Sequence, residues 1–178
     1  MFDYTKKESI TYKFSWDQLG DIAIGRENLG AQMPVTVYRL LEYCIKEVLE
    51  EDYGKEQMHR IFQKAGIIAG RELAHNLLDL SVDIHTFFGQ LQDVLKNMQV
   101  GILRVEKIDE STGTIYVTVA EDLDCSGLPV TGETVCFYDE GLIKGVLDTY
   151  TNCSYTVEEI DCWSTGARVC RFRANKEA

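Results

Sequence analysis

Long apolar runs are missing from this sequence of 178 residues. No stretch approaches the ~20 apolar residues that a membrane-spanning helix needs, so no transmembrane segment is expected. The first residues also lack the apolar region of a secretory signal, which predicts a cytoplasmic location. At a prior of roughly one domain per 150 residues, the length predicts a single domain. A hydrophobic content of 45% and a charged content of 26% are typical of soluble globular proteins and exclude a disordered class.

Positive charge is scarce. Lysine and arginine together number 18, against 29 aspartates and glutamates, which gives a formal net charge of −11. Proteins bind nucleic acid largely by replacing its counterions with Lys and Arg, so this balance argues against nucleic acid as a partner. It equally disfavours binding to an anionic membrane surface.

The chain has six cysteines but no C-x-x-C motif. This absence excludes the common zinc-ribbon, zinc-finger, thioredoxin-type and ferredoxin-type patterns. Cys44 is alone in the N-terminal half, and the other cysteines lie in the last third of the chain. In a reducing cytoplasm such residues are more often metal ligands, buried small hydrophobes or catalytic groups than disulfides.

The spacing of apolar residues predicts helices first and strands later. Helical periodicity covers residues 34–54, 55–78, 83–98 and 133–150, and strand patterns cover residues 102–108, 114–119, 155–160 and 167–173. The first helix carries an apolar stripe formed by Val37, Leu41, Cys44 and Val48, and charged residues fill its other face. This order predicts an α+β fold, in which a helical N-terminal half packs on an antiparallel sheet with a crossing helix and a C-terminal hairpin.

One group of residues has the composition of a metal site: Cys136, Glu159, Cys162 and Cys170. Three thiolates and one carboxylate make a closed set of four ligands that suits tetrahedral Zn²⁺. Cys136 falls in the first turn of the crossing helix, whose positive end favours an anionic site. A metal here joins the start of that helix to the C-terminal hairpin. Taken singly, each cysteine is more often a buried small hydrophobe, and Glu159 is more often a solvated strand residue.

Acidic runs at residues 47–52 and 121–124 are most simply solvated faces. The second run, with Cys125 next to it, has a weaker interpretation as a metal-binding segment. Cys44, Cys125 and Cys153 receive no assigned role from the sequence.

The C-terminal part of the chain resembles a known family. The pattern comprises Cys136-Phe-Tyr-Asp-Glu-Gly141-Leu-Ile-Lys-Gly145, then Glu159-Ile-Asp-Cys162, then Gly166-Ala-Arg-Val-Cys170-Arg-Phe172. It is similar to the C-terminal signature of the 4-vinyl reductase domain family. The similarity extends from Ile102 onwards and is weaker over the helical half.

The resemblance implies an α+β fold shared with Golgi transport-complex subunits and haem-type nitric-oxide sensors. In relatives that sense phenols and xylenes, this domain is the ligand-binding part of a transcriptional activator, and it dimerises. There the matching Cys, Glu, Cys and Cys hold a structural zinc, so the implied zinc ligands of this chain are Cys136, Glu159, Cys162 and Cys170. Those relatives continue into an ATPase and a DNA-binding domain, whereas this chain ends at Ala178. A sensor of this kind is therefore expected to act through a partner protein.

Aromatic content predicts an apolar pocket for a hydrophobic or aromatic small molecule. A tyrosine at its edge supplies the polar group that orients such a ligand. The expected lining is Phe87, Phe88 and Leu91 from the third helix, facing Ile102, Tyr116 and Phe137. The alternative is that these side chains simply fill the core.

Two other classes of function rank below the sensor. A dimeric interaction scaffold without a small ligand is supported by Gly66 and Gly70, which make a flat helix patch that another backbone can approach. An enzyme of tetrapyrrole or hydrocarbon metabolism has less support, because a zinc with four protein ligands leaves no position for water. No GxGxxG motif marks a nicotinamide site. His85 is the nearest candidate for a haem ligand, but the Tyr-x-Ser-x-Arg motif of nitric-oxide sensors is absent.

Overall fold

The structure is a computed structural model that describes residues 12–177. The chain divides into two compact units, with the boundary between Gln32 and Met33. The first unit holds two short helices, η1 (Trp16–Leu19) and α1 (Ile22–Gly25). The side chain of Asp21 caps α1 by accepting a hydrogen bond from the Ile24 amide at 3.0 Å. All candidate site residues lie in the second unit.

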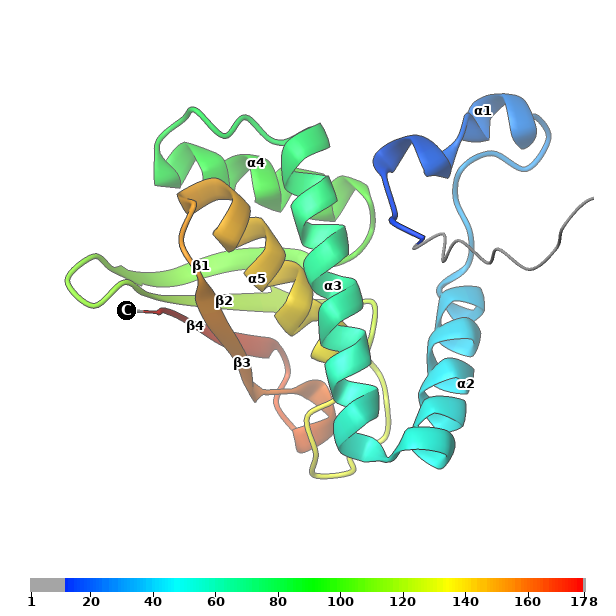
Figure 1. The fold of residues 1–178 in the computed structure, drawn as a ribbon. Coiled ribbons are helices and arrows are strands. Elements are labelled where there is room, and N and C mark those ends of the chain that lie inside the picture. Colours follow the sequence, from blue (N-terminus) through cyan, green and yellow to red (C-terminus); the bar gives the residue numbers. More distant parts are fainter. Residues whose placement is uncertain (1–11, 178) are drawn as a thin grey trace, which may run out of the picture. The chain divides into compact units, whose positions relative to one another are not determined.

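The second unit begins with three helices and continues with two hairpins separated by another helix (Figure 1). The elements are α2 (Val35–Tyr53), α3 (Lys55–Leu77), α4 (Ile84–Asn97), β1 (Ile102–Asp109), β2 (Thr114–Ala120), α5 (Phe137–Thr151), β3 (Tyr155–Asp161), η2 (Trp163–Thr165) and β4 (Cys170–Lys176). Every predicted helix and strand is present. Across residues 12–177, no helix combines the length and apolar character needed to cross a membrane.

Helix α5 starts later than the sequence predicts, at Phe137 rather than at residue 133. The preceding residues are held in a loop, because the Thr131 and Gly132 amides donate to the Ser164 carbonyl at 2.8 and 2.9 Å. These bonds tie the loop to the η2 turn and bring Cys136 toward the C-terminal hairpin.

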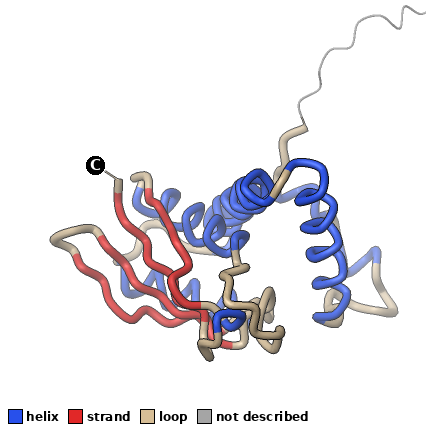
Figure 2. Tube along the Cα trace, turned by 90° about the horizontal axis from the view of Figure 1, so that it is seen from below, coloured by secondary structure: helices blue, strands red, loops and turns tan. Residues whose placement is uncertain are grey.

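The four strands form one antiparallel sheet in the order β1-β2-β4-β3. β2 and β4 are neighbours although α5 and β3 separate them in the sequence, and Val119 pairs with Cys170 in their register. Helices α4 and α5 contact the sheet on one face, and α3 packs on α5 (Figure 2). The fold class is α+β, as the sequence predicts.

The core lies between this face of the sheet and the helices. Along β2, Ile115 and Val117 are buried in the core, whereas Tyr116 between them is half-buried and points to the other face. The other face carries ion pairs that cross between strands, including Arg171 with Glu106 at 2.9 Å. The sheet therefore has one apolar side and one charged side.

Helices α3 and α5 cross at unusually close range through glycines spaced four apart on each helix. A Cβ placed on Gly66 or Gly70 would collide with α5 backbone at Tyr138 or Leu142. A Cβ on Gly141 or Gly145 would likewise collide with α3 backbone. The flat patch predicted at Gly66 and Gly70 exists, and α5 of the same chain occupies it.

Helix α2 has an inverted orientation. An apolar stripe normally faces the protein core, but Val37, Leu41 and Val48 are 50%, 64% and 55% exposed. The buried residues of α2 are Glu42 and Lys46. The inner face is polar because it lies against the turn that follows β2, whose carbonyl groups and acidic side chains accept hydrogen bonds from α2.

Candidate metal centre

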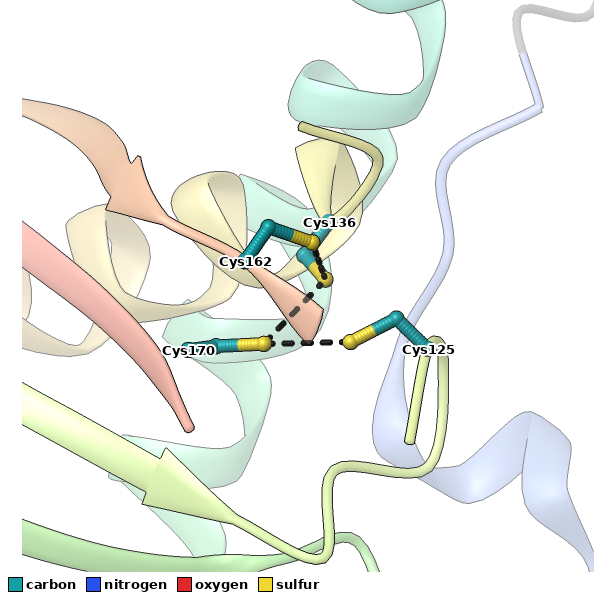
Figure 3. Close-up of side chains that lie close together, drawn as sticks. All are labelled: Cys125, Cys136, Cys162 and Cys170. Atoms are coloured by element: carbon teal, nitrogen blue, oxygen red, sulfur yellow. Dashed lines mark hydrogen bonds between the residues drawn. The ribbon is translucent and has the colours of Figure 1, made fainter. Parts of the chain in front are cut away.

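Four cysteine thiols meet at the end of the sheet next to the start of α5 (Figure 3). They come from four separate segments: the turn after β2 (Cys125), the residue before α5 (Cys136), the end of β3 (Cys162) and the start of β4 (Cys170). All four side chains are 0–1% exposed, and their sulfur atoms all lie within 4.8 Å of one another. The Cys136 sulfur lies 3.9 Å from that of Cys162 and 3.8 Å from that of Cys170.

Local hydrogen bonds hold each thiol in place. The Asp122 carboxylate accepts from the Asp124 and Cys125 amides at 2.8 and 3.3 Å, which closes the turn that carries Cys125. The Cys136 amide donates to Oε2 of Glu159 at 3.0 Å. The Cys162 amide donates to the Thr165 hydroxyl at 3.1 Å, within the η2 turn. The thiols are thus presented by four fixed backbone segments.

The donor set fits a structural zinc ion. Zn–S bonds of about 2.3 Å in a tetrahedron place sulfur atoms roughly 3.8 Å apart. The two sulfur distances from Cys136 equal that spacing to within 0.1 Å, at 3.8 and 3.9 Å. Thiolate ligands in a closed, buried set of four are typical of structural zinc. The four buried cysteines can therefore bind a metal ion.

Three of the four predicted ligands belong to this cluster: Cys136, Cys162 and Cys170. Glu159 is buried next to it, and its carboxylate accepts a hydrogen bond from the backbone of Cys136. The group of mutually close ligand atoms contains the thiol of Cys125 and not the carboxylate of Glu159. The role of Glu159 as a zinc ligand stays a prediction.

Cys125 had no assigned role because its signal depends on strand pairing. Its turn follows β2, and β2 pairs with β4, which begins at Cys170. The pairing of these two strands across α5 and β3 cannot be read from local spacing. The sequence did place Cys125 beside the acidic run 121–124, and Asp122 of that run caps the Cys125 turn.

Buried carboxylates surround the thiols. Asp122, Asp124 and Asp139 are all buried, and burial is the largest cause that raises the pKa of each, to about 6 for Asp124. Burial also raises the pKa of Glu159 to about 8. One oxygen each of Asp122, Asp124 and Glu159 has no hydrogen-bond partner among residues 12–177. Unpaired buried carboxylates are costly, and a cation held by the thiols would lower that cost.

The family now follows from comparison with known proteins. Residues 115–176, which include all four thiols, match the 4-vinyl reductase (4VR) domain. This part of the chain is a 4VR domain. The resemblance to the 4-vinyl reductase domain family, predicted from the cysteine and glycine pattern, is confirmed.

Solved structures with the same fold include a protein of this family. A vinyl-4-reductase family protein from Methanocaldococcus jannaschii has a TM-score of 0.58 and 17% identity, over 88% of this chain and 91% of that chain. The phenol-responsive sensory domain of the transcription activator PoxR, with phenol, has a TM-score of 0.62 and 15% identity, over 83% and 78%. A trafficking protein particle complex subunit 3 from Naegleria fowleri, covalently bound to palmitic acid, has a TM-score of 0.65 and 11% identity, over 81% and 95%. At these identities the similarity shows the fold alone.

The predicted pocket residues of the 4VR domain chain lie in different surroundings. Phe87, Phe88 and Leu91 of α4 are buried in the main core, where Phe87 stacks on Tyr150 with ring centroids 3.8 Å apart. These three side chains therefore pack against core neighbours.

The other three predicted lining residues are elsewhere. Ile102 begins β1 and is half-buried. Tyr116 points to the sheet face opposite the core. Phe137 packs in a separate small cluster with Met58 and Phe62. The structure thus does not gather the six residues around one space, and their role as a ligand pocket stays a prediction.

Two cavities adjoin α2. The α2/α3 cavity has a volume of about 260 Å³ and is lined by Tyr38, Leu41, Glu42, Ile45, Leu49, Ile61, Phe62, Ala65 and Tyr138. A second cavity of about 560 Å³ lies nearer the junction of α2 and α3, and its lining includes Glu47, Glu50, Glu51 and Glu133. The first cavity has mainly apolar walls, and the second is rimmed by carboxylates.

Proposed function

We propose that this chain is a small-molecule-binding, sensor-type domain with a structural zinc site and an apolar ligand cavity, which acts through a partner protein. The observation that carries the proposal is the α2/α3 cavity, in a 4VR domain chain whose fold is that of a phenol-responsive sensory domain. A non-catalytic role agrees with the closed set of buried thiols, which leaves no position for a reacting water.

The chemistry of the cavity indicates the class of ligand. Leu41, Ile45 and Phe62 form apolar walls, and the hydroxyl groups of Tyr38 and Tyr138 are the polar groups of the lining. Drug-sized ligands occupy sites of roughly 300–1,000 Å³, whereas this cavity has about 260 Å³. The expected ligand is therefore a hydrophobic or aromatic molecule of about one ring.

The zinc in this proposal has a structural role. The thiolates of Cys136, Cys162 and Cys170 hold it together with a fourth donor, Glu159 or Cys125. Bound zinc supplies a tetrahedral cross-link between the start of α5 and the strands, and no step of chemistry. The net negative charge and the charged outer sheet face make nucleic acid an unexpected partner, so the output of the sensor is expected to pass through a protein.

A dimeric scaffold without a small ligand is the second candidate. The observation that favours it is the exposed apolar stripe of α2, formed by Val37, Leu41, Ile45 and Val48. Contiguous exposed apolar surface commonly marks a protein–protein contact. Leu41 and Ile45 also line the α2/α3 cavity, so a homodimer formed through this stripe would cover the mouth of the cavity.

Native mass spectrometry of freshly purified protein distinguishes the two candidates. The sensor proposal predicts a co-purified organic molecule or, after stripping, binding of 4-fluorophenol that ¹⁹F NMR detects. Ala65→Phe places a ring at the cavity wall and is expected to weaken probe binding at least about tenfold, a loss of about 1.4 kcal/mol. Lys64→Phe, on the exposed side of the same helix, is the matched control and is expected to bind the probe as wild type does.

The contrary outcome is equally distinct. A clean protein mass, no response to 4-fluorophenol and a stable dimer mass would favour the scaffold and overturn the sensor proposal. Equal probe binding by Ala65→Phe and Lys64→Phe would place the ligand outside the α2/α3 cavity.

A further inference from the structure

We propose that Cys125 is the fourth metal ligand of this domain, and that through it the metal fastens α2 to the sheet, while Glu159 is a positioning residue that holds Cys136. The proposal rests on the metal centre of the proposed function and goes beyond it, because it gives the metal a mechanical connection to the helix that lines the ligand cavity.

The position of the Cys125 sulfur is the first argument. It lies 3.1 Å from the Cys170 sulfur and within 4.8 Å of the other two thiols. The Cys125 side chain is fully buried, although its turn connects surface segments. In Figure 3 its sulfur points toward the sulfur of Cys170, from the side opposite the β4 strand. Four sulfur donors therefore converge on one point, which is a complete set for tetrahedral zinc.

The hydrogen bonds of Glu159 are the second argument. Its Oε2 already accepts from the Cys136 amide at 3.0 Å. Its own amide donates to the Glu140 carboxylate in the first turn of α5 at 2.8 Å. These two bonds fasten β3 to the start of α5 in both directions. Carboxylates that orient a ligand from outside the coordination shell are common partners of metal sites, and Glu159 has that geometry toward Cys136.

The contacts between α2 and the Cys125 turn are the third argument. The Tyr38 hydroxyl donates to the Asp124 carboxylate at 2.8 Å, and the Tyr43 hydroxyl donates to the Asp124 carbonyl at 3.1 Å. The Arg39 guanidinium donates to the carbonyl groups of Leu123 and Ser126 at 2.8 and 2.9 Å. These bonds attach the polar face of α2 to both sides of Cys125.

The consequence is a chain of contacts from metal to cavity. A metal bound by Cys125 immobilises the turn, and the turn holds Tyr38, which lines the α2/α3 cavity. The other three thiols lie at the start of α5 and in the C-terminal hairpin, and so cannot hold α2 in this way. Cys125 is thus the thiol that couples the metal to the helix beside the ligand.

Zinc K-edge X-ray absorption counts the sulfur ligands directly. The proposal predicts four sulfur neighbours in the wild type, four in Glu159→Gln, and three with one oxygen or nitrogen in Cys125→Ser. Glutamine keeps the carbonyl oxygen that accepts from the Cys136 amide but is a poor zinc ligand, so it separates positioning from coordination. Glu159→Ala removes the acceptor and is expected to weaken zinc binding about 10–100-fold with the sulfur count unchanged. Cys153→Ser, outside the cluster, is the matched cysteine control.

Hydrogen–deuterium exchange tests the connection to α2. Amides of residues 38–46 are expected to exchange at least about tenfold faster in zinc-loaded Cys125→Ser than in wild type, because the turn that holds them opens more often. Zinc-loaded Glu159→Gln and Cys153→Ser are expected to exchange as wild type does in this segment.

The outcomes separate this proposal from the one on which it rests. Wild-type protein with three sulfur ligands and one oxygen would overturn the role of Cys125 and leave the zinc centre standing, and this measurement needs no variant to fold. Unchanged exchange of α2 in Cys125→Ser would overturn the mechanical connection. Purified wild type without stoichiometric zinc under reducing conditions would overturn the metal centre itself.

Discussion

Glu42 shows the electrostatic state of the inner face of α2. Its side chain is 5% exposed and pairs with Lys46 one helical turn later. Burial and the charge of Asp124 raise the pKa of Glu42 to about 7, against the opposing effect of Lys46. An unfolded chain releases this proton near the ordinary value of 4.5. In the window between these values the folded state binds more protons, so the stability contributed by this group falls as pH rises.

Glu42→Gln is therefore expected to flatten the pH dependence of the free energy of unfolding. The wild type should lose stability through Glu42 between about pH 4.5 and 7, and the amide, which does not titrate, should not. Urea unfolding at a series of pH values measures both slopes. Glu56→Gln, an exposed carboxylate in a similar pair with Arg60, is the control. Equal slopes for wild type and Glu42→Gln would contradict the assigned pKa.

Single residues also show the limits of local inference at the metal centre. Cys136, Cys162 and Cys170 were predicted because their spacing matches a family pattern along the chain. Cys125 was not, because its place among the thiols depends on β2 pairing with β4. Sequence spacing records which residues are close along the chain, and the register of distant strands is not contained in it.

At the scale of elements, the crossing of α3 and α5 depends on glycine. Gly66 and Gly141 each leave space that the backbone of the facing helix fills. A methyl group at either position has no room unless the helices separate, and α3 and α5 support both the core and the start of the metal centre. Overpacking of this kind typically costs about 1–3 kcal/mol.

Gly141→Ala is expected to lower the free energy of unfolding by about 1–3 kcal/mol or more, although alanine is the better helix former. Gly89→Ala is the matched control in α4, because a Cβ there meets no atom within 4 Å. Without a collision, alanine should be neutral or stabilising by up to about 1 kcal/mol. Denaturant unfolding followed by circular dichroism measures both changes. A stable Gly141→Ala protein would show that the helices can separate without loss.

Helix α2 shows what an element's own sequence cannot specify. Its amphipathic pattern predicts the helix and its limits, from Pro34 as the N-cap to Gly54 as the C-cap. The pattern does not specify which face is buried, and in the structure Glu42 and Lys46 face inward. That choice depends on the acceptor groups of the turn after β2, which lies far away in the sequence.

For the whole molecule, metal binding links segments that are remote along the chain. A ligand that binds only the folded state stabilises it by about 4 kcal/mol at 1,000 times its Kd. For a domain of this size, each 1 kcal/mol shifts Tm by about 2–4 °C. Removal of zinc with a chelator under reducing conditions is therefore expected to lower Tm by on the order of 10 °C.

Differential scanning calorimetry measures this shift, and addition of zinc should restore the original Tm while calcium should not, because thiolates select the softer metal. An unchanged Tm after chelation, with metal loss verified by mass spectrometry, would show that the thiol cluster is stable without an ion.

The sequence by itself determined the α+β class, the order of the elements and a thiol group at the C-terminal hairpin, because periodicity, turn residues and motif spacing are local properties of the chain. The family followed from the same local pattern. The tertiary structure alone decided that Cys125 joins the other thiols, that α2 presents its apolar side outward, and that Gly66 and Gly70 receive α5. These features arise from contacts between residues many positions apart, and only the packing of helices on the sheet brings those residues together.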